Sequence, residues 1–524
     1  MVLFMAMPVH GQSWFHQYGD SLNSDFFNSR EDYDKGFLFT GYQWDQAQGY
    51  AYGWLVKTDI NGNQLWAKSF GFPGRRVAFY SIANVPGGGN ILAGYTNKRI
   101  IQCTDPFIVK VNVCGEKEWC RIYKSQDCNS ACQGIVSLSD GSYIALMGYW
   151  KNFPVTHLWL LKLDNSGNII WQQAYATDPE YRDEVAYSLM MTMDSSVVIT
   201  GNTYYADSLF PGNQVLKFFL VKTGLDGNVI FDAPWGKNMG IISDAMTSIE
   251  GNAHALYTAG RRAREGANSG DSPCLFKTSG TGQSLYYNDI LDSTQAGNAT
   301  AISSFSDGTL AFSAQWWYST GLDTTGIFKT DTLGNVMNRK IITTEMWCAF
   351  FNSFRTFSDR QVFSGVINQK GVALKLNSDL EYDSIYTAPF TYDSLCPHAI
   401  ATDTVPMDDC TVITDIYEPE KDAVKTKLLV YPNPANSQVA ISPPEFIVRE
   451  SKDRGLTVST VYYKWSSAKL QVIDLGGRVL YSQEISDSTP VVHLETGGWK
   501  EGLYMARLLF MNETVASARF MVAR

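Results

Sequence analysis

Residues Gly53–Trp66 read GWLVKTDINGNQLW, and this phrase recurs along the chain. It consists of an apolar stretch that ends in Lys57, a turn rich in Asp, Asn and Gly, and a second stretch that reaches Trp66. Close copies are LWLLKLDNSGNIIW at Leu158–Trp171 and FLVKTGLDGNVIF at Phe219–Phe231. Short apolar runs separated by Asn-Gly or Asp-Gly turns are typical of β-hairpins. The phrase therefore predicts a repeated all-β unit.

Seven copies of the phrase can be placed by its lysine, and successive lysines lie 46 to 60 residues apart. They are Lys57, Lys110, Lys162, Lys222, Lys277, Lys329 and Lys375. A second phrase that ends in glycine precedes most copies, as in Phe39-Thr-Gly41 and Leu146-Met-Gly148. Each unit then holds four short strands, which at a period of roughly 40–50 residues is typical of a propeller blade. We expect a seven-bladed β-propeller over residues 13–390.

The N-terminal residues indicate how such a ring closes. Residues Trp14–Gly19 (WFHQYG) match Trp66–Gly71 (WAKSFG), the last strand of the first unit. We expect this early strand to pair into the final blade, because an open sheet edge would otherwise be exposed. Residues 1–12 are apolar and predict a signal peptide, with a buried first strand as the alternative.

The seven lysines allow two interpretations. Equivalent lysines around a ring could form a cationic central channel. Each lysine lies in an apolar strand, however, and we favour a salt bridge or hydrogen bond between blades that recurs with the repeat. The turn at Asp59 has alternating oxygen side chains like a calcium loop, but Gln64 takes the position where an EF-hand needs Gly. We therefore favour a hairpin turn there.

Composition excludes several classes of function. The net charge is −10 and the pI is near 5.2, whereas a nucleic-acid binder normally carries a basic face. No apolar run approaches the ~18 residues of a membrane span. The nine cysteines match no zinc spacing, so we expect local disulfides, including a loop closed by Cys396 and Cys410, with metal binding as the alternative. No motif for a metal, a cofactor or catalysis is evident, and we expect a monomer.

Aromatic residues follow the glycine phrase in several units. They are Tyr149, Trp150, Tyr204, Trp316 and Trp317. Such residues could form one ligand face that stacks on sugar rings. Packing between blades is the alternative, and we favour it for these residues.

The repeat ends before the last hundred residues. Residues 391–424 are rich in Asp, Pro and Thr and predict a linker. Residues 425–524 then alternate short strands with Pro, Asn and Gly turns and predict a small β-sandwich. Three motifs stand out there: Tyr431-Pro432-Asn433-Pro434-Ala435, Asp474-Leu-Gly-Gly477-Arg478 and Gly502-Leu-Tyr504.

In their order, these motifs resemble the type A C-terminal sorting domain of type IX secretion cargo. The repeats likewise resemble secreted Bacteroidota propellers. They also look like tryptophan-docking repeats, a likeness shared by many non-enzymatic propellers that implies no quinone cofactor. The resemblance implies passage through the periplasm and across the outer membrane, with the secretion machinery as a partner and the protein secreted or kept at the cell surface.

The leading hypothesis for function is an exported recognition module that binds a protein or a glycan. A glycan-active hydrolase that uses loops around the channel is one alternative. A structural adhesin without a specific ligand is the other.

Overall fold

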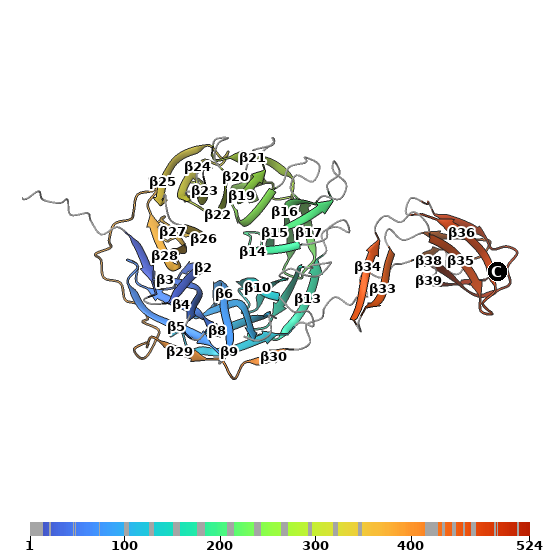
Figure 1. Cartoon of the computed structure of the whole chain (residues 1–524), viewed down its shortest axis with the longest axis horizontal. Coiled ribbons are helices and arrows are strands. Elements are labelled where there is room, and N and C mark those ends of the chain that lie inside the picture. Colours follow the sequence, from blue (N-terminus) through green and yellow to red (C-terminus); the bar gives the residue numbers. More distant parts are fainter. Residues whose placement is uncertain are drawn as a thin grey trace, which may run out of the picture. The chain divides into compact units, whose positions relative to one another are not determined.

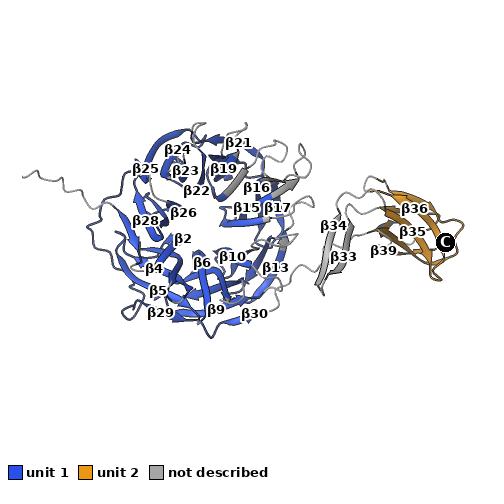
Figure 2. Cartoon of the chain, viewed as in Figure 1, with its two compact units in different colours: residues 1–416 blue, residues 417–524 orange. Residues whose placement is uncertain are grey.

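A computed structural model shows the chain as an all-β protein (Figure 1) with two compact units, residues 1–416 and 417–524 (Figure 2). It describes residues 14–19, 22–45, 47, 49–72, 74–98, 104–124, 130–149, 158–175, 184–206, 214–234, 243–263, 271–291, 296–317, 323–343, 348–413, 428–431, 435–442, 447–453, 456–462, 468–486, 489, 491–510 and 513–523. The predicted signal peptide lies outside these residues. No helix in the described ranges is long and apolar enough to cross a membrane.

The described residues of the first unit form seven sheets, here numbered in chain order, each with four antiparallel core strands. Sheet 1 holds β2 (Asn23–Glu31), β3 (Phe37–Asp45), β4 (Tyr50–Thr58) and β5 (Gln64–Gly71). Sheet 2 holds β6 (Arg75–Asn84), β7 (Asn90–Lys98), β8 (Thr104–Val111) and β9 (Lys117–Tyr123). Sheet 3 holds β10 (Ser130–Ser137), β11 (Tyr143–Tyr149), β12 (Leu158–Leu163) and β13 (Ile169–Tyr175).

The next three sheets repeat this order. Sheet 4 holds β14 (Glu184–Met191), β15 (Ser196–Ala206), β16 (Gln214–Gly224) and β17 (Val229–Pro234). Sheet 5 holds β18 (Ser243–Glu250), β19 (Leu256–Ala263), β20 (Asp271–Thr278) and β21 (Ser284–Asp289), with one 3-10 turn at Asn252–His254. Sheet 6 holds β22 (Ala296–Ser304), β23 (Leu310–Trp317), β24 (Asp323–Thr330) and β25 (Val336–Thr343). In Figure 1 the sheets surround a common centre, and the first strands, such as β2, β6 and β10, lie innermost.

Sheet 7 takes its fourth strand from the N-terminus. It holds β26 (Cys348–Arg355), β27 (Gln361–Ile367), β28 (Lys370–Leu376) and β1 (Phe15–Tyr18). β1 pairs antiparallel with β28, from Phe15 opposite Leu374 to Tyr18 opposite Gly371. The expected pairing of the first strand with the last unit is therefore confirmed.

An aromatic residue of one sheet contacts the last turn of the next. Trp14 donates from Nε1 to the carbonyl oxygen of Ile60 (3.0 Å), and Tyr18 donates from its hydroxyl to Gly62 (2.8 Å). The equivalent contacts elsewhere are Trp119 to Asn165 (3.0 Å), Tyr123 to Gly167 (2.8 Å) and Tyr175 to Gly227 (2.7 Å). The turn residue must be glycine because its φ is positive, and at Gly167 a Cβ would lie 2.9 Å from the Trp119 ring. The aromatic and the turn glycine of the repeat thus join neighbouring sheets.

The segment after sheet 7 is attached to sheets 1 and 2, and the prediction of a linker from residue 391 is wrong for residues 391–413. β29 (Asp403–Pro406) adds a parallel strand to β5, and β30 (Thr411–Ile413) adds one to β9. Disulfides join Cys114 to Cys396 and Cys120 to Cys410. The expected Cys396–Cys410 bond is therefore also wrong, because each of these cysteines lies against a different residue of sheet 2. We call residues 391–413 the strap.

The second unit contains three sheets in its described residues. One holds β31 (Leu429–Tyr431), β32 (Gln438–Ser442) and β37 (Val492–Glu495), and another holds β35 (Ala468–Asp474), β36 (Val479–Ile485), β38 (Gly502–Phe510) and β39 (Glu513–Val522). β33 (Ile447–Asp453) and β34 (Leu456–Tyr462) form a separate pair. Residues of the first two sheets, including Val439, Ile441, Leu470 and Leu508, share one hydrophobic core.

Candidate functional site

The first strand of every sheet in the first unit carries a register shift near its middle. In sheet 1 the shift falls between Phe26 and Asn28, so that Phe27 has no direct partner on β3. A Cβ on the paired Gly41 would lie 1.8 Å from the backbone oxygen of Asp25, so only glycine fits. This close approach explains why the glycine phrase recurs.

The bulged residues of three neighbouring innermost strands meet. The Phe27 ring lies 5.1 Å from the Tyr80 ring and 5.3 Å from the Phe351 ring. These are the bulged residues of sheets 1, 2 and 7, and each is partly exposed and follows a buried phenylalanine. Sheets 3 to 6 present Gln133, Tyr187, Met246 and Thr300 at the shift. The centre is therefore aromatic on one side and mixed on the other.

A polar group adjoins the aromatic side. The Tyr42 hydroxyl donates to Asp25 Oδ2 (2.9 Å), and the hydroxyls of Tyr80 and Tyr95 share a hydrogen bond. Burial raises the pKa of Asp25, and the hydrogen bond from Tyr42 offsets this only in part. Burial and the Asp25 charge likewise raise the pKa of Tyr42. A carboxyl with a raised pKa and several hydroxyls therefore lie close together here.

A cation completes this group. The Arg76 guanidinium lies 4.4 Å from the centre of the Trp44 ring, a cation–π geometry. Its Nε has no hydrogen-bond partner among the described residues. Asp25 and Arg76 lie near the start of their innermost strands, and Tyr42, Trp44 and Tyr95 lie toward the end of the adjacent strands. We call these five residues, together with Tyr80 and Phe27, the channel-mouth cluster.

Sequence reasoning missed the residues of this cluster. Tyr42 and Tyr95 each follow the recurrent glycine, as Gly41-Tyr42 and Gly94-Tyr95, and this repeated dipeptide was the available signal. Asp25 could not be found in this way, because sheet 2 has Ala78 at the equivalent position opposite Tyr95.

The repeat lysines are occupied in structural contacts. Lys57 is fully buried and pairs with Asp32 and with Asp34 (2.7 Å). Burial alone would lower the pKa of Lys57, but the two carboxylates outweigh it and the net shift is upward. For Lys375 burial prevails over the Asp383 carboxylate 3.0 Å away, and the pKa is lowered.

The expected contact between blades is made by three of these lysines, because Lys110, Lys329 and Lys375 each donate to the turn after the third strand of the next sheet. It does not describe Lys57 and Lys222, whose carboxylate partners lie in their own sheets. Asp32 and Asp34 lie in the turn between the first two strands of sheet 1, and Asp194 pairs with Lys222 (2.6 Å) from the same turn of sheet 4. Lys329 lies 3.9 Å from Asp307 in the same way. Lys110 instead bonds Asn165 of sheet 3 (2.8 Å) as well as Glu118 (3.0 Å). Lys277 lies over the rings of Tyr257 and Tyr286, and Lys162 is partly exposed in β12.

The predicted ligand-face aromatics separate into two sets. Trp316 is 2% exposed and packs against Phe328 in the core, so it presents no surface, because its position in β23 faces a neighbouring sheet. Tyr149, Tyr204 and Trp317 lie in the second strands of their sheets, but their side chains are outside the described part. Trp150 lies outside the described residues altogether.

The other sequence candidates have local explanations. Asp59 Oδ1 accepts the backbone N–H groups of Asn61 and Asn63 (both 2.8 Å), as in a hairpin turn. Three cysteines, Cys132, Cys274 and Cys348, are free and buried. Burial raises the pKa of Cys348 to about 12, so this thiol is unreactive.

The motifs of the second unit also have local roles. Asp474 Oδ1 accepts the backbone N–H groups of Gly476 and Arg478 (both 2.9 Å), and Gly477 has a φ of +79°. Tyr504 is buried, stacks 5.8 Å from Phe520 and donates its hydroxyl to Lys500 (2.6 Å). Gly502 opens β38 and Tyr431 ends β31. Pro432, Asn433 and Pro434 lie outside the described residues.

Residues 429–523 match the family model described as a secretion system C-terminal sorting domain. The chain therefore carries the sorting domain of type IX secretion that its motifs predicted, and it is destined for secretion or for attachment at the outer cell surface.

No curated protein matches the chain. A solved structure of unknown function from Dyadobacter fermentans DSM 18053 is similar over 56% of this chain and 92% of its own, with 10% identity and a TM-score of 0.42. An ulvan lyase, described as a polysaccharide lyase, is similar over 70% and 96%, with 8% identity and a TM-score of 0.46. The β-propeller domain of the Trilobed protease from Pyrococcus furiosus is similar over 71% and 95%, with 8% identity and a TM-score of 0.39.

Proposed function

We propose that the first unit is a closed seven-bladed propeller and that the second is a β-sandwich. Support for closure comes from β1, which pairs with β28 and places Trp14 and Tyr18 against the turn of sheet 1. Support for the sandwich comes from the core shared by its three-stranded and four-stranded sheets.

We further propose that this exported propeller is a recognition module that binds a glycan at the channel-mouth cluster. The observation that carries the proposal is the Asp25–Tyr42 pair beside the Phe27, Tyr80 and Tyr95 rings. Ligand sites are typically concave and aromatic, with a few convergent polar groups. Sugar rings require both an apolar face to stack on and donors and acceptors for their hydroxyls. The rings and the Asp25 carboxyl supply these together.

The strand register relates further aromatic residues to Trp44 of the channel-mouth cluster. Trp44 stands six residues after Leu38, which pairs with Lys57. Tyr204 and Trp317 stand at the same distance from the residues that pair with Lys222 and Lys329, and Trp150 shares this spacing in the sequence. Tyr204 and Trp317 therefore hold the strand position of Trp44, whereas Tyr149 holds the position one residue earlier.

Binding explains the cluster better than hydrolysis does. Most glycoside hydrolases need two carboxyl groups that flank the scissile bond. Among the described residues, no second carboxylate contributes to the pKa shift of Asp25. A raised carboxyl pKa beside a tyrosine suits a hydrogen-bonding site for neutral hydroxyls equally well.

The test is a glycan array with the full chain, followed by titration of the best glycan and a screen for its cleavage. Asp25→Ala and Tyr95→Ala should each weaken binding at least tenfold, since each removes a polar group or a stacking face. Gln315→Ala is the matched control, because Gln315 holds the register position of Tyr42 and Tyr95 in sheet 6. Equal affinity of all three variants would place the ligand elsewhere, and cleavage of the bound glycan would replace the binding module with an enzyme.

A further inference from the structure

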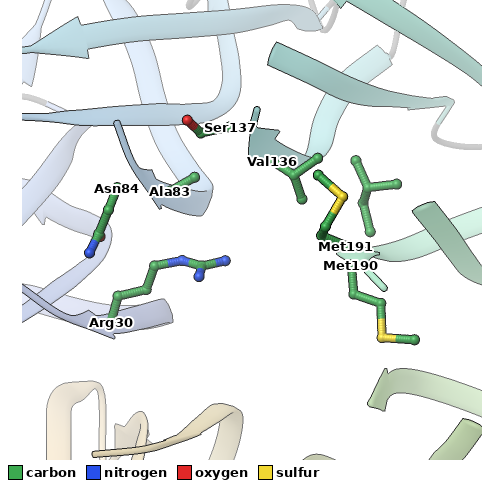
Figure 3. A pocket seen from close by; sticks show the side chains of 8 residues that line it. Arg30, Ala83, Asn84, Val136, Ser137, Met190 and Met191 are labelled. Atoms are coloured by element: carbon green, nitrogen blue, oxygen red, sulfur yellow. The ribbon is translucent and has the colours of Figure 1, made fainter. Parts of the chain in front are cut away.

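A second concave site lies at the other end of the innermost strands. It is a pocket of about 330 Å³ between β2, β6, β10 and β14, seen from close by in Figure 3. The residues that line it include the apolar side chains of Val136, Leu189, Met190 and Met191 beside three polar residues. Arg30 extends its guanidinium into this space from β2. The pocket therefore combines one cation with both apolar and polar side chains.

The charge of Arg30 is poorly compensated within the protein. Arg30 Nε donates to the backbone oxygen of Ile82, and no other partner of its guanidinium occurs among the described residues. Burial lowers the pKa of Arg30, and no carboxylate of the described chain contributes to that shift. Arginine nevertheless stays protonated at neutral pH. Arg30 is partly buried, and a cation removed from water without a counter-charge is costly, so proteins normally pair it.

The repeat does not require an arginine here. The positions equivalent to Arg30 are Ala83, Val136, Met190, Ile249, Ser303 and Phe354, and none of them is charged. The repeat lysines behave differently, because buried ones such as Lys57 and Lys222 have carboxylate partners in their own sheets. Arg30 is therefore a departure from the structural pattern of the ring.

Two polar residues share the pocket wall with Arg30. Ser137 Oγ is buried and has no hydrogen-bond partner among the described residues. Asn84 already donates from Nδ2 to the backbone oxygen of Glu31 (2.9 Å). The free donors of the pocket are therefore the terminal nitrogens of Arg30 and the hydroxyl of Ser137, and both groups suit an anionic oxygen.

We propose that this pocket binds a small organic carboxylate with an apolar body. The guanidinium fork matches the two oxygens of a carboxylate, and the flexible methionines can adapt to the apolar part. A volume of about 330 Å³ lies at the lower end of the range for ligand pockets. Asp25 and Arg30 are five residues apart on β2, about 17 Å along the strand. The site is therefore separate from the channel-mouth cluster and does not rest on the proposed function.

The experiment compares two probes of nearly equal shape, 3-phenylpropionate and 3-phenylpropan-1-ol, by titration calorimetry on the full chain. The wild-type protein should bind the acid at least tenfold more tightly than the alcohol. Arg30→Met should remove that preference, because it keeps the length of the side chain without its charge. Arg339→Met, on the exposed strand β25, is the matched control and should leave the preference for the acid unchanged.

Each outcome bears on the proposal. Equal binding of acid and alcohol by the wild-type protein would overturn it, as would the absence of saturable binding of the acid at millimolar concentration. An unaltered preference in Arg30→Met would also overturn it. The wild-type comparison of the two probes needs no variant, so it decides the question even where Arg30→Met does not fold.

Discussion

Substitution of Tyr18 by Phe tests whether the ring is closed at the junction of its first and last strands. Tyr18 is 5% exposed, and its hydroxyl donates to the carbonyl oxygen of Gly62 over 2.8 Å. Tyr123 is 0% exposed and makes the same bond to Gly167, also over 2.8 Å, between sheets 2 and 3. Tyr123→Phe is thus a matched control away from the junction.

A buried hydrogen bond stabilises a protein by about 1 kcal/mol, and an unsatisfied carbonyl adds to the loss. We expect each substitution to cost about 1–2 kcal/mol of local stability. Since 1.4 kcal/mol is about a factor of ten in an equilibrium constant, the amides of β1 should exchange with solvent about tenfold faster in Tyr18→Phe. The amides of β9 should do the same in Tyr123→Phe. Hydrogen exchange is preferable to a melting curve, because the temperature shift per kcal/mol is small in a unit of this size.

The closure argument fails if Tyr123→Phe accelerates exchange as expected but Tyr18→Phe does not. It fails equally if the β1 amides of the wild-type protein already exchange at the rate of an unprotected chain. A closed ring predicts comparable protection at both junctions, because the same contact is made at each.

Three further predictions follow from the structure. Gly41→Ala should destabilise the first unit by several kcal/mol in denaturant unfolding, since its Cβ would lie 1.8 Å from a backbone oxygen. Gly148→Ala should cost about 1 kcal/mol or less, because its Cβ would meet a flexible side chain at 3.2 Å. Equal costs for the two substitutions would refute the explanation of the glycine by the bulge. Replacing Cys120 and Cys410 together by Ser should free the end of the strap and lower the stability by about 2–3 kcal/mol, the value for a disulfide that closes a loop of roughly 15–20 residues. Limited proteolysis should then cut the strap, and a strap that stays resistant to the protease would contradict the prediction. The pKa of Asp194 is lowered to about 2, chiefly by its hydrogen bond from Lys222, so the stability that this carboxylate adds is present above about pH 4 and is lost as the pH falls towards 2. Because the Asp194 side chain is 41% exposed, Asp194→Asn should remove no more than about 1 kcal/mol of the loss of stability in acid. An unchanged pH dependence of stability would show that the Asp194–Lys222 pair does not contribute.

The repeating parts of the fold could be predicted from the sequence because each repeat presents the same local pattern. Lysine, turn glycine and aromatic recur at nearly fixed spacing, and the match of Trp14–Gly19 to Trp66–Gly71 located the strand that pairs with β28. The sorting motifs were equally legible, since Asp474 and Gly477 act within one turn.

Contacts between distant residues could not be predicted in this way. Cys114 and Cys396 are 282 residues apart, and no periodicity relates the strap to sheet 2. Repetition also cannot say which neighbour a side chain meets, so Lys57 was assigned to another blade rather than to Asp34.

The residues that carry the functional proposals are those that differ from their equivalents in the other repeats. Leu146-Met-Gly148 was aligned with Phe39-Thr-Gly41, although the strand register places Met147, not Gly148, at the position of Gly41. Arg30 and Asp25 are residues that the other sheets mostly replace by apolar ones, and an alignment of repeats hides such exceptions.

The most direct test of the central claim, that an exported propeller binds a glycan at its channel mouth, is a crystal structure of the full chain with the tightest glycan from the array. The account predicts a sugar ring in van der Waals contact with Tyr42 or Tyr95 and a hydroxyl within hydrogen-bonding distance of Asp25. A glycan bound at the outer strands or the strap, with the channel-mouth cluster empty, would contradict it.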